Sequence, residues 1–522
     1  MRGGGGTTVL PQGQSARRLL HPGLVFAALF VLCALPLSLG AILPLVDYPN
    51  HLARMYLLAN LPSSPTLQAF YAIDWHPLPN LGMDAVVPTL SRVVPLVWAG
   101  KIFVLLTFLL LAGGVAALHR ALFGRWTLWP CLAFLLLYNR VLLWGFLNYL
   151  FGIGLALCGV AVWIALRERH PAMRVLLGAV FALATYFAHL AAYGVLGLLI
   201  FGYEAGVLWR RRASAAECAL ALALAGLPFL PALAFLGESA ASLSGKISFG
   251  SPWRKLDMPF SIFDNYSRPF DVACFVIAIG GLAIAFRRRW IKLAPSMVLP
   301  LLLLALAFLA MPSQLFTASG ADHRLPLVLA LVVVAATSWV GPGPGTELRF
   351  LACAGLLFLL RLGVVASSWH ASERDYGEVL AALDGIPVGS RIAVAYPGTA
   401  VHAGGTPLVH LPVWAIAQRQ AFVSTLLASP AQQPVVFQPP YRELAELLPP
   451  GRLWNAFMGG APLDAAQRAA LERCDFVVFT NAKPFRLAGT DGLEPAYSEP
   501  RLQLYRLTHQ SEGASSVKGP TF

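Results

Sequence analysis

The chain has 522 residues, of which 57% are hydrophobic and only 12% are charged. Charged residues make up about 25% of an ordinary soluble domain, so this composition excludes a soluble globular protein and indicates a polytopic membrane protein. The formal net charge of +13 does not indicate nucleic-acid binding, because the basic residues form short clusters between apolar runs, as topology-setting loop charges do.

The first segment, residues 1–22, is rich in glycine and small polar residues, and we predict that it is disordered and cytoplasmic. The apolar run that follows resembles the core of a signal peptide, and Arg17 and Arg18 would suit a twin-arginine signal. Many further apolar runs follow, so we interpret this one as the first transmembrane helix and an uncleaved anchor.

The segment 23–369 is predicted to form a transmembrane module. A helix needs about 20 predominantly apolar residues to cross the hydrocarbon core of a bilayer. About eleven runs meet or nearly meet this length; they lie near 23–45, 98–118, 126–138, 145–166, 173–188, 190–209, 216–236, 271–286, 293–311, 325–341 and 349–368.

The distribution of basic residues predicts the orientation. If the spans alternate from a cytoplasmic N-terminus, every cluster of adjacent arginines falls on the inner side, as the positive-inside rule expects. The predicted topology is therefore N-in and C-out, which puts the loop 46–97, the turn at His189, the loops 237–270 and 312–324, and the tail on the outer side. The inner clusters are Arg17 and Arg18; Arg120 and Arg125; Arg167, Arg169 and Arg174; Arg210, Arg211 and Arg212; Arg287, Arg288, Arg289 and Lys292; and Arg349.

The tail has a mixed composition with proline and glycine punctuation. "SERDYGEVLAALDGI" has helical spacing, with Ser372 as a cap and Gly385 as a stop. "SRIAVAY", "DFVVFT" and "RLQLYRL" are typical of short strands. We therefore expect residues 370–510 to form an extracytoplasmic α/β domain and residues 511–522 to be a disordered end.

The motif with the clearest chemical content is "LVDYPNHLARMY", which directly follows the first apolar run. On a helix that starts here, Asp47, His51 and Arg54 can share one face. A carboxylate at this boundary could take a proton from a hydroxyl group, and an imidazole and a guanidinium could bind phosphate oxygens. Tyr48 and Asn50 complete the predicted substrate-binding group. The alternative is an interfacial amphipathic helix with Asp47 as its cap.

A long N-in first helix, an acid-bearing outer loop, many further helices and an outer C-terminal domain resemble the GT-C glycosyltransferase superfamily. Its members use polyprenyl-phosphate sugars and include protein mannosyltransferases and the aminoarabinose transferases of lipid A. The resemblance implies an inverting transfer to an outer-side lipid, glycan or protein, with Asp47 as the base or acceptor-orienting group.

Many members of that superfamily carry two adjacent acids in the first outer loop, whereas this chain has Asp47 followed by Tyr48. No metal site or other cofactor is therefore predicted. Asp74 and Asp84 could supply a second carboxylate or could cap turns. The seven cysteines show no C-x-x-C spacing, so neither a zinc site nor a disulfide framework is supported.

Further polar residues lie at the predicted outer ends of the helices. Arg140 and Asn148 either line the site or form a short polar turn. His189 either contacts the acceptor or a phosphate, or is a hydrogen-bonded turn residue. His323 and Arg324 lie at the mouth of a span, where Arg324 would neutralise charge on a leaving phosphate or, alternatively, satisfy a helix end.

Arg361 lies inside the last apolar run. A buried arginine in a membrane span is costly unless paired, and it indicates either lipid-phosphate binding or a structural ion pair. Because Arg361 is the only clear intramembrane charge in the sequence, a solute or lipid transporter is less favoured than a transferase. A non-catalytic envelope assembly protein stays open as another alternative.

These observations predict a multi-pass protein of a bacterial inner membrane, with its C-terminal domain in the periplasm. The predicted partners are the lipid bilayer, a polyprenyl-phosphate sugar donor, and a glycan, lipid or protein acceptor. No nucleic-acid partner is expected.

Overall fold

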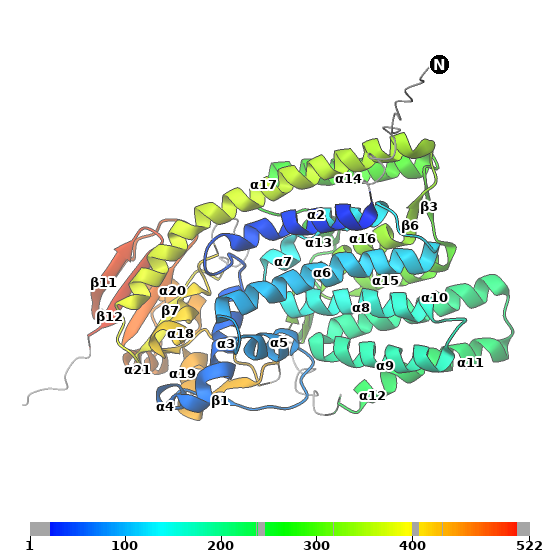
Figure 1. Ribbon diagram of the computed structural model, residues 1–522. Coiled ribbons are helices and arrows are strands. Elements are labelled where there is room, and N and C mark those ends of the chain that lie inside the picture. Colours follow the sequence, from blue (N-terminus) through cyan, green and yellow to red (C-terminus); the bar gives the residue numbers. More distant parts are fainter. Residues whose placement is uncertain are drawn as a thin grey trace, which may run out of the picture. The chain divides into compact units, whose positions relative to one another are not determined.

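The computed structural model describes residues 21–235, 237, 246–316, 318–398, 407–430 and 432–508 (Figure 1). Apart from His21 and Pro22, the predicted disordered segments 1–22 and 511–522 lie outside the described residues. The protein is a polytopic helical membrane protein with a C-terminal domain that contains a mixed β-sheet.

The chain folds as two compact units, each assembled from separate stretches of sequence. Unit 1 comprises the chain up to Ser38, then Val104–Leu142 and Leu147–Ala366. Unit 2 comprises Leu39–Phe103, Leu143–Phe146 and the chain from Ser367 onward. The predicted transmembrane module 23–369 included the loop 46–97, whereas in the structure this loop and the tail share one compact unit.

Helices long and apolar enough to cross a membrane account for most of unit 1, and α6 and α17 each have residues in both units. The described residues contain seven such helices: α6 (Leu96–Phe123), α8 (Leu147–Ala165), α9 (Pro171–Ala188), α10 (Leu190–Arg211), Ala215–Leu233, which joins α11 (Ala215–Gly226), η4 (Leu227–Phe229) and α12 (Leu230–Leu233), α14 (Arg268–Arg287) and α17 (Gly343–Asp384).

The other four predicted runs form shorter elements. The run near 126–138 is not an α-helix but the 3-10 helix η3, and its eight residues extend only about 16 Å, half of a hydrocarbon core of about 30 Å. The number of crossings and the N-in, C-out orientation therefore stay predictions. The short elements are α2 (Pro22–Ala34) with η1 (Leu35–Ser38), η3 (Trp129–Leu136), η7 (Pro295–Met297) with α15 (Val298–Ala310), and α16 (Leu325–Ala336).

Small residues allow the helices of unit 1 to approach one another closely. Helices α8, α9 and α10 pack together, and α15 packs on α10 (Figure 1). A Cβ atom on Gly154 of α8 would come within 2.6 Å of the Cβ atom of Leu110 on α6. A Cβ atom on Gly202 of α10 would come within 2.9 Å of the Cα atom of Pro300 on α15. Such contacts replace the hydrophobic driving force that is absent between helices in lipid.

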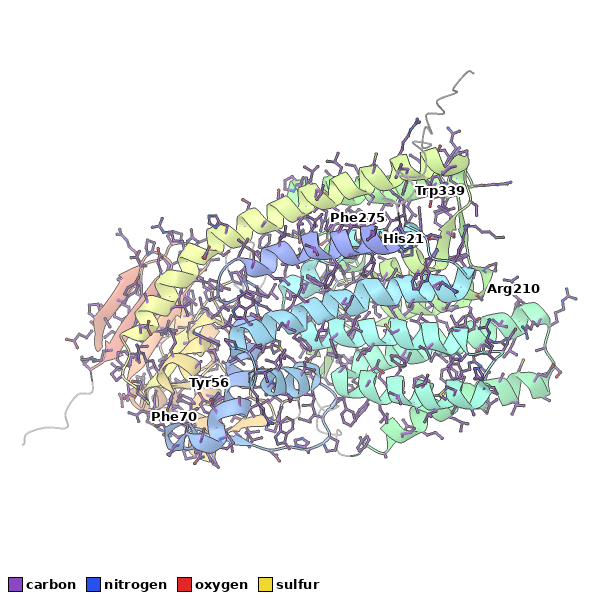
Figure 2. All side chains as sticks on the ribbon, in the orientation of Figure 1. His21, Tyr56, Phe70, Arg210, Phe275 and Trp339 are labelled. Carbon is purple, nitrogen blue, oxygen red and sulfur yellow. The ribbon has the colours of Figure 1, made fainter. Side chains whose placement is uncertain are left out.

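Tryptophans cluster at a two-stranded sheet of unit 1. Strand β3 (Ile291–Leu293) pairs antiparallel with β6 (Thr337–Trp339). Figure 2 labels Trp339. Its ring centroid lies 6.0 Å from that of Trp129 and 5.6 Å from that of Trp290. Tryptophans gather at membrane–water interfaces, and the predicted topology assigns this strand pair to the inner one.

Two predicted outer loops of unit 1 meet in a small antiparallel sheet, in which β4 pairs with both β2 and β5. This sheet brings the basic segment around Arg254 close to the segment that carries His323 and Arg324. The short elements of this region are α7 (Arg140–Leu143), β2 (Lys246–Ser248), α13 (Arg254–Asp257), η6 (Met258–Ile262), β4 (Gln314–Phe316), β5 (Ala318–Ser319) and η8 (Asp322–Arg324).

Unit 2 contains a five-stranded mixed sheet in the order β11-β12-β10-β7-β8. Strand β7 runs parallel to β10 and β8, whereas β12 is antiparallel to β10 and β11. The three strands predicted from the tail sequence are present as β7, β10 and β12. The strands are β7 (Arg391–Ala395), β8 (Phe422–Val423), β10 (Phe476–Thr480), β11 (Leu493–Glu499) and β12 (Leu502–Leu507).

The predicted separate helix at the start of the tail is instead the end of α17. Ser372 lies inside that helix, where its hydroxyl donates to the carbonyl oxygen of Ser368 at 2.9 Å, so Ser372 is not an N-cap. The helix ends at Asp384, immediately before the predicted stop at Gly385.

The loop after the first apolar run folds together with the tail inside unit 2. Strand β1 (Tyr71–Ile73) pairs antiparallel with β9 (Val435–Phe437), and the Tyr71 hydroxyl donates to the carbonyl oxygen of Ala421 at 3.0 Å. The remaining elements of unit 2 are α3 (Tyr48–Asn60), η2 (Leu61–Ser63), α4 (Pro65–Gln68), α5 (Gly82–Leu90), η10 (Leu411–Trp414), α18 (Ala415–Arg419), α19 (Pro439–Leu447), α20 (Pro450–Phe457) and α21 (Ala465–Glu472).

Candidate functional site around Asp47

Asp47 lies at the N-cap position of α3, and Pro49 is in the first turn of that helix. The Asp47 side chain makes no capping hydrogen bond, although a cap was the alternative interpretation of the sequence. The carboxylate is 21% exposed, so it is reachable by a ligand while most of it is enclosed by protein.

The four-residue segment 143–146 of unit 2 fixes the backbone before α3. The amide N–H of Val46 donates to the Leu143 carbonyl oxygen at 2.9 Å, and that of Asp47 donates to the Trp144 carbonyl oxygen at 3.1 Å. Gly145 has a φ of +90°, which favours glycine. A Cβ atom there would lie 2.9 Å from both the Cβ atom and the backbone nitrogen of Asp47, so no side chain fits between them.

The imidazole of His410, a residue of the tail, lies beside the Asp47 carboxylate. Its Nε2 atom lies 3.4 Å from Oδ1 of Asp47. Its Nδ1 atom lies 3.3 Å from Nδ2 of Asn50, a residue of α3 that is fully buried. The Tyr396 ring packs edge-on against His410 with a centroid distance of 6.0 Å.

The surroundings of Asp47 hold neighbouring titratable groups in their neutral forms. Burial lowers the pKa of His410 to about 4. Burial, followed by the negative charge of Asp47, raises the pKa of Tyr396 to about 12. At neutral pH these side chains are therefore an uncharged imidazole and an uncharged phenol. Neither of them places a compensating positive charge beside the carboxylate.

His51 lies one turn after Asp47 on α3. Its Nε2 atom is 3.1 Å from the Gly145 carbonyl oxygen, a contact that requires the proton to be on Nε2. Burial, followed by the positive charge of Arg54, lowers the pKa of His51 to about 3. Its Nδ1 atom is buried and has no hydrogen-bond partner among the described residues, so it can accept one further hydrogen bond.

Arg54 and Tyr48, both predicted to bind substrate, have fully buried side chains. The Arg54 guanidinium forms two hydrogen bonds with the Asp84 carboxylate, at 2.7 and 3.0 Å. Asp84 is therefore committed to this ion pair and does not form a second carboxylate beside Asp47. The Tyr48 hydroxyl lies against Gly100 of α6. These surroundings favour structural roles for both residues.

A cationic group of unit 1 contains two other predicted residues, His323 and Arg324. Arg324 lies over the Tyr149 ring, 5.7 Å from its centroid, and a guanidinium nitrogen of Arg254 lies 3.5 Å from Nε2 of His323. Lys255 lies 3.4 Å from the carboxylate of Asp322. Three cations and one carboxylate thus gather here, which leaves a net positive group.

His189 and Asn148, predicted near the same outer ends, also belong to unit 1. His189 is the N-cap of α10, and its Nδ1 atom accepts from the Ala191 amide N–H at 3.1 Å, which matches the predicted turn residue. Its ring meets that of Tyr149 edge-on at 5.4 Å. Burial, followed by the charge of Arg324, lowers the pKa of His189 well below its usual range. Asn148 is buried in the first turn of α8.

Arg361 has the surroundings of a structural ion pair. Its guanidinium donates to the carbonyl oxygens of Phe263 at 2.7 Å and Tyr138 at 2.9 Å, and lies 3.3 Å from the Asp271 carboxylate. Its side chain is only 3% exposed. This arrangement satisfies the charge inside the helical unit without a ligand.

Arg140 likewise contacts a carboxylate, that of Asp264, which also receives a hydrogen bond from Arg268 at 3.0 Å. Among the described residues no group of three or more His, Cys, Asp or Glu side chains could hold a metal ion. Within the described residues, the regions around Arg361 and Arg140 therefore contain no set of metal ligands.

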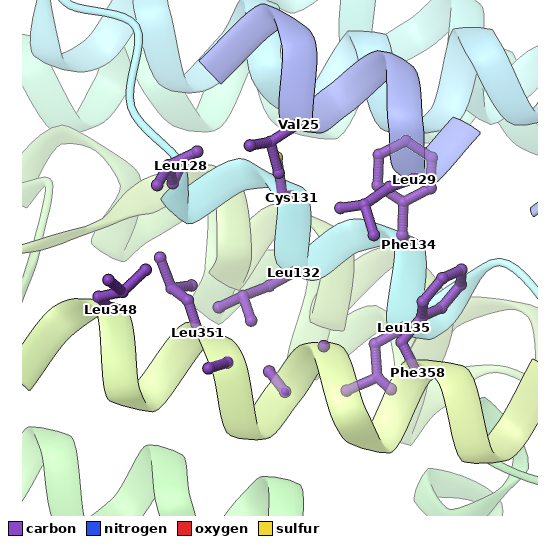
Figure 3. A pocket seen from close by; sticks show the side chains of 13 residues that line it. Val25, Leu29, Leu128, Cys131, Leu132, Phe134, Leu135, Leu348, Leu351 and Phe358 are labelled. Carbon is purple, nitrogen blue, oxygen red and sulfur yellow. The ribbon is translucent and has the colours of Figure 1, made fainter. Parts of the chain in front are cut away.

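An apolar pocket of unit 1 lies between α2, η3 and the first half of α17 (Figure 3). Val25 and Leu29 face it from α2, and Leu351 and Phe358 face it from α17. Its lining carries no charged side chain, so it suits hydrocarbon and not group-transfer chemistry.

Two residues of the candidate site are not evident from sequence reasoning. Gly145 occurs in "LLWGFLNYL", where its positive φ has no local signal beyond the glycine itself. His410 follows an apolar dipeptide in the tail, and nothing in the local sequence marks it as a functional residue. Asn50 and His410 are 360 positions apart, so no local pattern connects them.

No protein-family model matches the chain, and a search of curated proteins finds no match. Two solved structures of ArnT from Cupriavidus metallidurans do match it. The structure bound to undecaprenyl phosphate has a TM-score of 0.54 and 13% sequence identity, and the match covers 96% of this chain and 99% of that one. The apo structure has a TM-score of 0.53 and 13% identity, with 97% and 100% covered. Over nearly its whole length, this chain has the fold of ArnT.

Proposed function

We propose that the protein is a membrane glycosyltransferase that moves a sugar from a polyprenyl phosphate to an acceptor on the outer side of a bacterial inner membrane. The observation that carries this proposal is the partly exposed carboxylate of Asp47, held at the start of α3 in a chain with the fold of ArnT. One of the matching ArnT structures is bound to undecaprenyl phosphate, which supports a donor of the same lipid class.

In this reaction a hydroxyl oxygen of the acceptor attacks the anomeric carbon of the sugar. A new carbon–oxygen bond forms on one face while the bond to the phosphate oxygen breaks on the other, so the configuration inverts. The electron pair of the broken bond leaves with the polyprenyl phosphate. Asp47 takes or orients the hydroxyl proton, a role for which a carboxylate beside a neutral His410 is suited.

We assign binding of the donor phosphate to the cationic group of unit 1, with Arg324 and His323 as its central residues. Arg254 belongs to the same group, in which Lys255 is already paired with Asp322. Charge-assisted hydrogen bonds to phosphate oxygens are strong, and fixed cations stabilise the charge that develops on a leaving phosphate. His189 and Asn148 are proposed to support this group through Tyr149 and α8.

Three arginines are outside the proposed chemistry. Arg54, Arg140 and Arg361 each contact a carboxylate within their own unit, and a cation already paired inside protein gains little from a ligand phosphate. The pairing of Arg361 with Asp271 also weakens the case for a transporter, which would need ionisable groups that change partners during transport.

The acceptor is a lipid, glycan or protein exposed on the outer side, and no metal or other cofactor is assigned to the reaction. Asn50 and His51 do not contact a ligand in this proposal. Asn50 is buried against the tail, and His51 holds the Gly145 carbonyl oxygen.

The test is a transfer assay with the full-length protein in lipid nanodiscs. Radiolabelled polyprenyl-phosphate sugars would be offered one at a time with envelope extract as the acceptor source, and nucleotide sugars would serve as the control donors. Transfer from one lipid-linked donor, with release of polyprenyl phosphate and an inverted anomeric configuration, is the expected result. Transfer from a nucleotide sugar alone, or folded protein that releases no polyprenyl phosphate from any donor, would contradict the proposal.

A further inference from the structure

The contacts of Asn50 fix which atoms of its side-chain amide donate and which accept. The Oδ1 atom accepts a hydrogen bond from the Leu427 amide N–H at 2.7 Å, and the Nδ2 atom donates to the Thr425 carbonyl oxygen at 2.9 Å. Rotating the amide by 180° would place oxygen against a carbonyl and NH₂ against an N–H. The amide therefore has one acceptable orientation.

This orientation determines the tautomer of His410. The second donor position of Asn50 Nδ2 faces Nδ1 of His410 at 3.3 Å, so that Nδ1 atom must be the acceptor. A neutral imidazole that accepts at Nδ1 carries its proton on Nε2. That Nε2 atom lies 3.4 Å from Oδ1 of Asp47, so the ring places its one N–H on the side of the carboxylate.

The chain around His410 keeps this arrangement rigid. His410 and Asn50 are buried, and the two backbone groups that hold Asn50 both come from the segment that follows strand β8. Among the residues that the structure describes, the titratable groups that face His410 are Asp47, Tyr396 and His51. A proton added at Nδ1 would meet the Asn50 amide hydrogens, so both burial and hydrogen bonding favour the neutral ring.

We infer that His410 is a positioning residue that orients the Asp47 carboxylate through Nε2–H and does not itself accept the hydroxyl proton. This inference rests on the proposed function, in which Asp47 is the base or orienting group. When the acceptor oxygen bonds to the anomeric carbon, its proton passes to Asp47 and the electron pair of the broken bond leaves with the phosphate. The imidazole gains and loses no proton.

Residues of the tail thus help to position Asp47, which lies in the predicted first outer loop. Residues Asn50, Thr425 and Leu427 set the proton position on His410, and His410 sets the direction of the carboxylate. A displacement of about 1 Å at a reacting group can cost about a hundredfold in rate, so this positioning matters for transfer.

The test compares His410→Gln with His410→Ala in the transfer assay. A glutamine amide can donate to Asp47 as Nε2–H does, but it cannot act as a base. We expect His410→Ala to lower kcat at least about tenfold with KM changed less than about threefold, and His410→Gln to recover most of that loss. Equal loss of kcat in both folded variants would indicate that imidazole itself takes the proton, and would overturn the inference.

A spectroscopic measurement keeps the test independent of activity and of the variants' folding. The full chain would be labelled with ¹⁵N-histidine in nanodiscs, and the His410 signals assigned by their loss in His410→Gln. We expect a neutral ring with Nε2 protonated and Nδ1 bare at pH 7. Protonation at Nδ1 would overturn the inference whatever the activity. If Asp47→Asn retained full transfer while this tautomer was present, the role of Asp47 in the proposed function would fail instead.

Discussion

Two charged residues, Arg361 inside an apolar helix of unit 1 and Asp47 after an apolar run in unit 2, have surroundings that differ in kind. The Arg361 side chain is 3% exposed, and its guanidinium donates hydrogen bonds to two backbone carbonyl oxygens and a carboxylate. The Asp47 side chain is 21% exposed and lies beside a neutral imidazole. The charge of Arg361 is therefore paired inside the protein, whereas the carboxylate of Asp47 is fixed in position and accessible to a ligand.

The difference separates two meanings of a charged residue near a membrane. An intramembrane charge is a candidate functional group by default, but a buried pair with ideal acceptors has already used its charge to stabilise one packing arrangement. A carboxylate fixed by backbone contacts and open on one side can exchange a proton with a ligand. Exposure and the charge of the neighbours distinguish the two cases better than sequence position does.

The largest effect on stability is expected for Arg361→Gln. This change leaves Asp271 buried without its cation, and breaking a buried ion pair typically costs about 3–5 kcal/mol. Thermal unfolding in nanodiscs would measure the loss, and the double variant Arg361→Gln with Asp271→Asn should recover part of it. If Arg361→Gln were as stable as wild type, the ion pair of Arg361 would not stabilise the fold, and the contrast with Asp47 would be contradicted.

A similar loss is expected for Arg54→Met within unit 2. Arg54 and Asp84 are both fully buried at their side chains, so the change leaves an unpaired carboxylate at a cost again of about 3–5 kcal/mol. The matched control is Arg54→Met with Asp84→Asn, which should be more stable than the single variant. If Arg54→Met instead kept its stability and lost donor binding, Arg54 would be a ligand residue as the sequence first suggested.

Gly145→Ala should affect both stability and transfer. The positive φ of Gly145 costs a non-glycine residue about 1–2 kcal/mol, and the new Cβ atom would lie 2.9 Å from the backbone nitrogen of Asp47. We expect at least about a tenfold loss of transfer, because Asp47 must move. Gly377→Ala is the control, since a Cβ atom there meets nothing within 4 Å. Equal activity of both variants would contradict the proposed fixing of Asp47.

Stability should fall as the pH is lowered below about 6.5, the pKa of an unfolded histidine. The folded pKa values of His410 and His51 are lowered to about 4 and about 3, so the unfolded chain binds more protons throughout this window. The loss for each histidine is at most about 1.4 kcal/mol per pH unit. Unfolding at pH 7.5, 6.5 and 5.5 would measure it, and the double variant His51→Gln with His410→Gln should show a smaller slope.

Local patterns were sufficient to predict much of the fold. Long apolar runs identified the long helices, and the short apolar and aromatic segments "DFVVFT" and "RLQLYRL" identified β10 and β12, because both signals depend on neighbours in sequence. The same reasoning failed for η3, where an apolar run of adequate composition forms a short 3-10 helix. It also failed for Ser372, since hydroxyl residues are tolerated inside helices when they bond to a preceding carbonyl.

The candidate site was only partly predictable, because its contacts are distant in sequence. Asp47 was evident from its place after an apolar run. The partner of Arg54 lies 30 positions later, and Asn50 lies 360 positions from His410, so periodicity could not connect them. A charge in a sequence shows a need for compensation, and only the fold shows which group provides it.

The most direct test of the central claim compares Asp47→Asn with Asp74→Asn in the sugar-transfer assay. Both aspartates lie in unit 2 within the predicted outer loop, but the Asp74 side chain is 64% exposed and lies in a surface segment. We expect Asp47→Asn to lose at least about a hundredfold in transfer while its unfolding temperature is unchanged, and Asp74→Asn to retain wild-type transfer. Full transfer by folded Asp47→Asn would contradict the claim that this carboxylate carries the reaction.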